Sequence, residues 1–419
     1  MATATERCEA LIIGGGAAGI ATAASLLKRR PDTSVIIVEP SATHDYQPGW
    51  TFVGSGVFRQ EQTRRATLDL IPRGAHVKWL RAAAAQFNPD NDEVLLTDGR
   101  LVRYQMLVVA AGVKLDWDAI VGLRDTLGRN GVTSNYDYHT APYTWQLVRA
   151  LKRGTALFTQ PPLPIKCAGA PQKAMYLSAS HWRDMGCLND IAIEFHNAGD
   201  TLFGVQEYIP ALMEYVQRYR ANLCFHSALV AVDGPAHTAT FAVTAADGSM
   251  TRQTRTFDML HVTPPQKPVD AVSASPLAGA GGWVEVDPAT LRHPRYANVF
   301  ALGDVAGTTN AKTAAAARKQ APVVAANVAA LLEQRALCAQ YDGYGACPLT
   351  VERGKIVLAE FTYGGKLAPT FPTWLLDGTR PTRLAWFLKE DIIPAIYWNL
   401  MLKGREWLCR PAALRSSAS

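Results

Sequence analysis

The sequence predicts an α/β protein with two Rossmann-like domains and a C-terminal amphipathic helical segment. Near the N-terminus, an apolar strand runs directly into a glycine-rich turn and a helix. A second alternation of strands and helices occupies the middle of the chain, and an aromatic segment with helical periodicity ends it. We expect the first domain to comprise 1–112 and 291–350, the second domain 113–290, and the C-terminal segment 351–419.

The composition excludes several classes of protein. The 419 residues are 48% hydrophobic and 19% charged, as in ordered globular proteins with two or three domains. The net charge of +6 is spread along the chain, so no nucleic-acid partner is expected. The seven cysteines form no C-x-x-C pair, and their number is odd, so we expect neither a metal site nor a secreted disulfide framework. No apolar run is long enough for a transmembrane helix.

The N-terminal turn has the context of a dinucleotide-binding site. The strand 9–13 leads into the motif G-G-G-A-A-G at 14–19, a helix follows, and the next strand, 34–38, ends at Glu39. The glycines make the turn, admit a pyrophosphate at the helix N-terminus and let the helix pack on the strand. They are Gly14, Gly15, Gly16 and Gly19. Glu39 is placed to accept hydrogen bonds from ribose hydroxyls. The alternative is a glycine-rich turn without a ligand.

Two later strands indicate that the nucleotide is FAD. The strand 102–112 ends in small residues at Gly112, and the strand 298–304 closes with Asp304. Both patterns resemble flavoproteins with two dinucleotide-binding domains, in which the aspartate contacts the flavin ribityl chain. A helix begins near Lys312, and its N-terminus can stabilise negative charge on a reduced flavin. The alternative role of Asp304 is to cap that helix.

The second domain lacks the glycine loop that would bind a nicotinamide. After the strand 155–158 the chain reads Q-P-P-L-P, and prolines cannot form the turn that opens a phosphate-binding helix. Cys167 follows, between Lys166 and Lys173 and before a predicted helix over 171–180. Both lysines and the helix N-terminus favour its thiolate form. Cys167 is therefore either a reactive nucleophile or a buried structural cysteine.

Two cysteines are candidate partners of Cys167. Cys347 lies at a glycine-rich turn followed by proline, and Cys338 lies at the end of a predicted helix. The residues themselves favour Cys347 but do not establish contact across a sequence separation of 180 residues.

The C-terminal stretch, about 384–414, has apolar residues at helical spacing. A charged group at 389–391 interrupts it, and Pro394 is expected to break or kink the helix. The tryptophans in this stretch are Trp386, Trp398 and Trp407. Apolar faces with interfacial tryptophans and flanking basic residues favour a monotopic membrane anchor. The alternative is an amphipathic pair that packs on the protein body or on another subunit.

The chain resembles the sulfide:quinone oxidoreductases over nearly its whole length, and especially the branch that includes the animal mitochondrial enzyme. The most specific motifs are K-C-A-G-A-P-Q-K at 166–173 and Y-D-G-Y with C-P-L within 341–349. Further matching residues occur within 38–50, 134–136, 261–265, 312–316 and 397–399. The resemblance implies that Cys167 and Cys347 are the redox pair, which decides against Cys338.

The resemblance also implies a glutathione-reductase-like arrangement with FAD as the cofactor. The implied FAD contacts are Gly15, Gly16, Glu39, Gln47, Asp304, Lys312 and Thr313. Hydrogen sulfide is then the electron donor and a ubiquinone-type quinone the acceptor, in a pocket expected to use Phe361, Tyr363 and Tyr397. A small thiol or sulfite would take the sulfane sulfur, and a second copy of the chain, in a homo-oligomer, is a further candidate partner. Because the targeting extension of the animal enzyme is missing, we expect a peripheral protein of a prokaryotic plasma membrane.

The expected mechanism is attack of HS⁻ on a Cys167–Cys347 disulfide, or on its sulfur-bridged form, with Lys173 as electrostatic support. By resemblance, Cys347 lies on the flavin side and Cys167 carries the persulfide. Three alternatives are kept. They are an NADH:quinone oxidoreductase of the same fold, a sulfide dehydrogenase that passes electrons to a haem subunit, and a non-catalytic flavin-binding module at a membrane.

Overall fold

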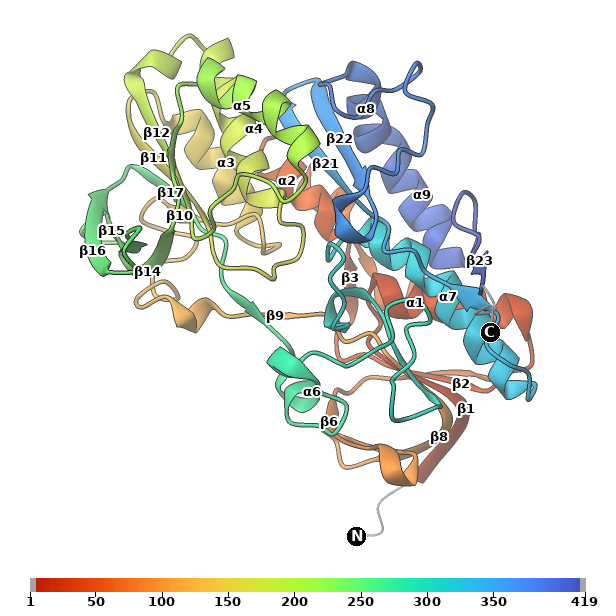
Figure 1. The fold of residues 1–419 in the computed structure, drawn as a ribbon. Coiled ribbons are helices and arrows are strands. Elements are labelled where there is room, and N and C mark those ends of the chain that lie inside the picture. The colour runs from red at the N-terminus through yellow and green to blue at the C-terminus, as the bar shows by residue number, and fades with distance from the viewer. Residues whose placement is uncertain (1–4, 415–419) are drawn as a thin grey trace.

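Two mainly parallel sheets form the centres of the fold in the computed structural model, which describes residues 5–414 (Figure 1). The first sheet has seven strands in the order β5 (Val77–Leu80), β2 (Val35–Val38), β1 (Thr5–Ile13), β8 (Leu101–Val109), β7 (Glu93–Leu96) and β6 (Ala84–Asn88), with β19 (Val299–Ala301) paired to β8. Strands β7 and β6 form an antiparallel edge. The central strands are almost continuously apolar, because helices and loops cover both faces of the sheet.

Two long helices pack together on this first sheet. They are α1 (Ala17–Arg29) and α7 (Ala314–Leu332), and both are rich in alanine, which allows close approach. The smaller elements are the antiparallel pair β3 (Thr43–Asp45) and β4 (Arg64–Ala66), the helix α2 (Trp50–Val53), which contacts α3 (Ala141–Ala150), and the helix α6 (Asp270–Ser273), which contacts β6. Helix α1 directly follows β1 and α7 follows β19, so both helices begin at the carboxyl edge of the sheet.

The second sheet is parallel throughout. Its order is β10 (Val132–Thr133), β17 (Met259–His261), β11 (Gly154–Gln160), β12 (Ile191–Asn197) and β13 (Asn222–Cys224). One face packs on α3 (Ala141–Ala150), α4 (Ala170–Asp184) and α5 (Ile209–Arg218). The other face packs on an antiparallel sheet of β14 (Ser227–Asp233), β15 (Thr238–Thr244) and β16 (Met250–Thr256). The short pair β9 (Lys114–Leu115) and β18 (Gln266–Lys267) connects the two domains. The α/β class with two sheet-centred units is thus confirmed.

A β-hairpin of β21 (Gly345–Glu352) and β22 (Lys355–Phe361) packs on α4 (Figure 1). Cys347 lies within β21, opposite Ala359, and not at the turn that we expected. Pro348 is tolerated there because a two-stranded sheet leaves a free edge on each strand. The hairpin spans the expected boundary at 350, so β21 and the first part of the C-terminal segment form one unit.

The C-terminal segment contains α8 (Arg383–Phe387), a π-helical turn (Leu388–Ile392) and α9 (Ile393–Asn399). Helical backbone continues from α8 through the π-helical turn into α9, and Pro394 follows that turn closely. The irregularity therefore lies where the proline was expected to break or kink the helix. Strand β23 (Ala412–Ala413) returns to pair with β20 (Ala339–Gln340). Within residues 5–414, no helix combines the length and the apolar character needed to cross a bilayer.

Candidate active site

The glycine-rich turn after β1 has the geometry of a phosphate-binding loop. Gly14 has a φ of +108°, and a Cβ atom there would lie 2.3 Å from the carbonyl oxygen of Ala110, so only glycine fits. At Gly19 a Cβ atom would lie 1.9 Å from the carbonyl oxygen of Gly14. Gly16, at the N-terminus of α1, faces open space. This open space adjoins the positive end of a helix, where an anionic group is stabilised.

Glu39, at the end of β2, is held in one orientation by backbone amides. Its Oε2 atom accepts a hydrogen bond from Gly15 N at 2.8 Å, and its Oε1 atom accepts one from Ser41 N at 2.8 Å. Each carboxylate oxygen keeps a second lone pair for a hydroxyl donor.

The segment after β19 carries a second acid and a buried lysine. Lys312 Nζ donates to the carbonyl oxygens of Asp304 and Ala306, at 2.7 and 2.9 Å. Burial raises the pKa of Asp304 and lowers that of Lys312 to about 8. The cap of α7 is Thr313, whose Oγ1 accepts a hydrogen bond from Ala316 N at 3.2 Å. The alternative role of Asp304 as the helix cap is therefore excluded.

These features fit a dinucleotide with hydroxyl-bearing linkers. Gly112, like Gly16, faces open space, and the carboxylates of Glu39 and Asp304 can accept from ribose and ribityl hydroxyls. The buried side chain of Trp50, beside Lys166, carries an indole Nε1 without a hydrogen-bond partner among the described residues, and the buried amide of Asn135 also lacks one. Buried polar groups are almost always paired, so these atoms are available to a ligand.

The structure brings Cys167 and Cys347 together. Their Sγ atoms lie 3.5 Å apart, beyond the roughly 2.05 Å of a disulfide bond, so both are free cysteines here. Lys173 Nζ lies 3.3 Å from the Sγ atom of Cys167. Cys338 is exposed, and its thiol contacts the carbonyl oxygen of Ala326 at 3.7 Å.

Local backbone geometry makes this approach possible. Cys167 adopts a left-handed conformation with a φ of +51°, and its N–H donates to the carbonyl oxygen of Lys312 at 2.8 Å. Two residues later, a Cβ atom on Gly169 would lie 2.5 Å from Cys347 Sγ. The glycine therefore leaves the space that the second sulfur fills. The hairpin supplies that sulfur from a fully packed strand, with Cys347 only 2% exposed.

The two thiols are electrostatically distinct. A hydrogen bond from Cys347 and the charge of Lys173 hold the pKa of Cys167 well below its ordinary value. The same hydrogen bond, together with burial, raises the pKa of Cys347 well above its ordinary value. Burial opposes the charge of Lys173, but the negative charge of Cys167 outweighs it and raises the lysine pKa. Cys167 is therefore the thiolate of the reduced pair, and Cys347 is the thiol that donates to it.

A second lysine near the sulfur pair was not predicted from sequence. Lys389 lies in the π-helical turn, is only 3% exposed and donates to the carbonyl oxygen of Pro48 at 3.0 Å. Its Nζ atom lies 5.8 and 5.7 Å from the ring centroids of Tyr46 and Phe52. Burial, followed by repulsion from Lys173, lowers its pKa to about 7. π-Helical turns often occur at functional sites.

Lys166 has other partners than the sulfur pair. Its Nζ atom donates to Gln47 Oε1 at 2.6 Å and lies 5.5 Å from the ring centroid of Trp50. Loss of hydration lowers its pKa to about 8. Of the two lysines that flank Cys167 in sequence, Lys173 contacts the thiolate and Lys166 faces the nucleotide-binding domain.

The three residues expected at a quinone lie in two places. Phe361 and Tyr363 are half-buried at the end of β22, where the Tyr363 hydroxyl donates to the carbonyl oxygen of Pro288 at 2.9 Å. Tyr397 is buried in α9, and its hydroxyl lies 2.7 Å from Nε2 of His44. Among the described contacts, none joins Tyr397 to either of the other two.

Comparisons with known proteins give a consistent result, although no family model matches the chain. The chain is 37% identical over 402 residues to the mitochondrial sulfide:quinone oxidoreductase of Mus musculus, which covers 96% of this chain and 88% of that protein. It is 38% identical over 400 residues to the corresponding protein of Dictyostelium discoideum, with 94% and 86% covered. The X-ray structure of the sulfide:quinone oxidoreductase from Aquifex aeolicus matches with a TM-score of 0.74 at 16% identity, covering 94% of this chain and 92% of that one.

Proposed function

Because the chain belongs to the sulfide:quinone oxidoreductase family, we propose that Cys167 and Cys347 are the groups with which it oxidises sulfide. As a member of this family, the protein is a flavoprotein that oxidises hydrogen sulfide and reduces a quinone. The observation that carries the proposal is the 3.5 Å approach of the two Sγ atoms beside Lys173 Nζ. A dithiol with one stabilised thiolate is suited to thiol–disulfide exchange.

The proposed cycle begins with the disulfide form of the pair. HS⁻ attacks the sulfur of Cys167, the S–S bond breaks, and Cys167 becomes a persulfide while Cys347 leaves as a thiolate. A small thiol or sulfite then removes the outer sulfur, and Cys167 is released as a thiolate. Lys173 favours this step because a stabilised thiolate leaves faster. Cys347 takes up a proton in the reduced pair, and loss of that proton and of two electrons to the bound flavin restores the disulfide.

A sulfur-bridged form of the pair fits the same geometry. Two S–S bonds of about 2.05 Å at a near-tetrahedral angle span roughly 3.3 Å between the outer sulfurs. The observed separation of 3.5 Å is close to this span. A bridging sulfur would therefore need less movement of β21 than a direct disulfide needs.

The residues described above fit FAD as the flavin. Gly14, Gly15, Gly16 and Gly19 would hold the pyrophosphate, and Glu39 the adenosine ribose. Asp304 would contact the ribityl chain, with Gly112, Gln47, Lys312 and Thr313 around the rest of the cofactor. When bound, FAD accepts two electrons and passes them to the quinone. Lys166, held by Gln47, keeps a positive charge on the flavin-binding side of the sulfur loop.

The NADH-dependent alternative is disfavoured by the second domain. Between β11 and α4 the chain has prolines where a nicotinamide site would need a glycine-rich turn. The N-terminus of α4 instead lies beside the sulfur pair, since Lys173 projects from its first turn.

We further propose that the C-terminal segment attaches the protein to a lipid surface and admits quinone from it. Large apolar side chains are exposed there, namely Leu367, Trp374, Leu375, Leu384, Phe387, Trp407 and Leu408. Trp398 is buried and does not take part, contrary to the expected interfacial role of all three tryptophans. Phe361 and Tyr363, which lie in the first part of this segment, remain the proposed quinone contacts. The expected prokaryotic plasma membrane gains no support from the relatives above, two of which are named mitochondrial.

Anaerobic titration of the flavin-loaded enzyme with sulfide tests the proposal. Sulfide should bleach the flavin of the wild type and of a Cys338→Ser control, and a quinone should restore the colour. Cys167→Ser and Cys347→Ser should bind the flavin normally but should not be bleached. Full bleaching of either variant would contradict the cysteine mechanism, whereas bleaching by NADH would favour the alternative.

A further inference from the structure

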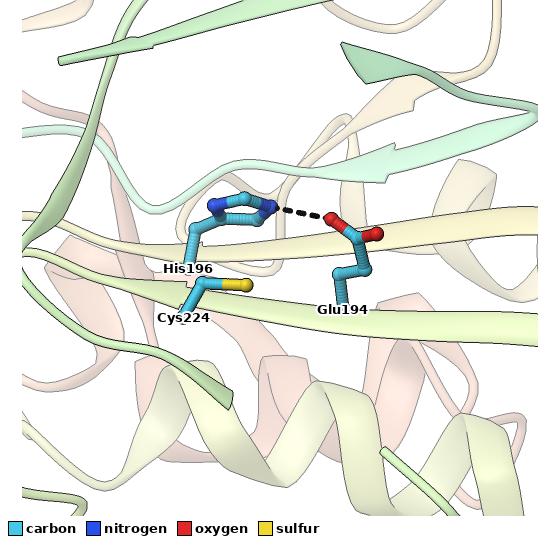
Figure 2. A group of neighbouring side chains, drawn as sticks. All are labelled: Glu194, His196 and Cys224. Atoms are coloured by element: carbon cyan, nitrogen blue, oxygen red, sulfur yellow. Dashed lines mark hydrogen bonds and ion pairs between the residues drawn. The ribbon is translucent and has the colours of Figure 1, made fainter. Parts of the chain in front are cut away.

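A cluster of three potential metal ligands lies on the second sheet, outside the sulfur site. Glu194 and His196 are two residues apart on β12, so their side chains share one face of the sheet. Cys224 on β13 pairs directly with His196 in the parallel register. Figure 2 shows the three side chains grouped together. One ligand atom from each lies within 4.8 Å of the ligand atoms of the other two.

The His196 ring is fixed through one of its two nitrogens, as in a metal-binding histidine. His196 Nδ1 lies 2.8 Å from Ser227 Oγ, and the ring stacks on Phe241 with centroids 3.7 Å apart and an angle of 13°. Its other nitrogen, Nε2, lies 2.9 Å from Glu194 Oε2 (Figure 2). Metal-binding histidines characteristically use one nitrogen for the ion and fix the ring through the other. Ser227 supplies that second contact.

The ligand types favour a thiophilic ion of borderline softness. Thiolate, imidazole and carboxylate together are ligands of Zn²⁺, and three protein ligands leave one position open. The thiolate and the carboxylate balance the double charge of the ion. Asn222 Nδ2 already donates to Cys224 Sγ at 3.4 Å, and such a contact can remain when the sulfur is bound.

An ion can reach the cluster from solvent. Strand β13 is at the edge of the sheet, and Glu194 and Cys224 are only partly buried. Arg255 Nε lies 3.5 Å from Glu194 Oε2, but its side chain is 41% exposed and can move into solvent. The ligands therefore have a rigid base and an open side.

We propose that Glu194, His196 and Cys224 form a binding site for a zinc ion. Binding releases the thiol proton of Cys224, and the imidazole proton moves from Nε2 to Nδ1, where it is donated to Ser227. No oxidation is involved. The absence of C-x-x-C pairs led us to expect no metal site, but these ligands come from two strands that only the fold brings together. The proposal is independent of the cysteine mechanism above.

Metal retention by the flavin-loaded enzyme tests the site. The enzyme is equilibrated with Zn²⁺, passed through a desalting column, and its zinc content is measured by mass spectrometry. Co²⁺ is used in parallel, because thiolate-bound Co²⁺ absorbs at wavelengths where oxidised flavin does not. We expect about one zinc per chain, with retention at least about tenfold weaker in Cys224→Ser and in His196→Gln.

Two controls make the result decisive. Cys187→Ser removes another half-buried cysteine of the same domain, and Cys347→Ser removes the redox pair as a competing site. Both should keep the zinc. The proposal is overturned if Cys224→Ser and His196→Gln retain as much zinc as the wild type, or if zinc is lost only in Cys347→Ser. The flavin content of each variant shows whether it is folded. If Cys224→Ser does not fold, Glu194→Gln replaces it as a ligand variant.

Discussion

The hydroxyl of Tyr397 lies 2.7 Å from Nε2 of His44, and Nδ1 of the same ring lies 3.1 Å from the carbonyl oxygen of Gly15. Burial lowers the pKa of His44, so the ring is neutral. The carbonyl oxygen of Gly15 can only accept a hydrogen bond, so Nδ1 of His44 carries the proton. Nε2 therefore accepts a hydrogen bond from the Tyr397 hydroxyl. The C-terminal helix α9 is therefore hydrogen-bonded to the glycine-rich loop through one histidine. Arg29 Nη2, 3.0 Å from Glu406 Oε2, adds a second attachment to α1.

Tyr397→Phe should weaken flavin retention without emptying the site. The variant leaves the buried Nε2 of His44 without its donor, which costs about 1 kcal/mol or more, or roughly a fivefold change in an equilibrium. Flavin release on dilution, followed by fluorescence, measures the effect. The matched control is Tyr215→Phe, which removes a hydroxyl of the second domain that donates to Glu352 at the end of β21. Equal flavin release from both variants would show that α9 does not support the loop.

Lys173→Gln should shift the pH dependence of Cys167 reactivity to higher pH. The pKa of this thiol is depressed, so the reduced wild type keeps a thiolate well below the ordinary range. Removing a cation at 3.3 Å should raise the midpoint by roughly 1–3 pH units. Alkylation rates of Cys167 as a function of pH, read by peptide mass spectrometry, give the midpoint. Lys152→Gln, on the surface of the same domain, should leave it unchanged.

Lys389→Met should make the folded protein more stable but slow its reaction with sulfide. The folded-state pKa of about 7 lies below the usual lysine value, so the unfolded chain binds more protons between these two pH values. Stability of the wild type should therefore rise with pH above about 7, and this rise should be smaller in the methionine variant. At pH 7 the variant should melt at a higher temperature but reduce its flavin more slowly with sulfide. A variant that is both less stable and fully active would contradict this account.

Gly169→Ala should separate the two sulfurs. The added methyl group would lie 2.5 Å from Cys347 Sγ and 2.3 Å from Leu349 Cδ2, so β21 must move. Such overpacking costs about 1–3 kcal/mol, and we expect sulfide-dependent bleaching to slow by about tenfold or more. Gly204→Ala is the control, because nothing lies within 4 Å of its added atom. An unchanged bleaching rate would mean that the spacing of the sulfurs is not limiting.

The exposed apolar side chains of the C-terminal segment should carry lipid binding. Trp374 is 85% exposed, and Phe387 is exposed on α8. Replacing both by serine should reduce co-flotation with liposomes by about tenfold or more, since each large apolar side chain contributes about 1.5–3 kcal/mol on burial. Reduction of a water-soluble quinone analogue should persist. Met250→Ser removes another exposed apolar side chain, from β16, and should not affect flotation.

Local patterns predicted the elements around the glycine-rich loop well. The order of strand, glycine turn, helix, strand and acid is contiguous, and β1, α1, β2 and Glu39 lie where the pattern indicated, with ends displaced by a few residues. Gly14, Gly15 and Gly19 are each constrained by atoms of Ala110, Glu39 or Gly14, which lie close in sequence or at the end of an adjacent strand. Such features depend on short-range geometry, which a contiguous stretch of sequence is enough to predict.

Long-range features could not be predicted in this way. Lys389 looked like an interruption of an apolar helix, because sequence does not show whether a charge faces water or a buried cluster. Trp398 matched an interfacial tryptophan by spacing, but it packs against His44 in the interior. The contact between Cys167 and Cys347 came from family resemblance, and the Glu194–His196–Cys224 cluster depends on the register of β12 and β13.

The 180 positions that separate Cys167 from Cys347 have a consequence for the lifetime of the protein. A covalent link that closes so long a loop removes much of the freedom of the unfolded chain, worth about 5 kcal/mol in the entropic description. Each catalytic cycle would then alternate between a cross-linked and an unlinked molecule. Enzyme deprived of an electron acceptor would accumulate in the unlinked form, which unfolds more readily. Sulfide supply without quinone should therefore shorten the survival of the protein under proteolysis.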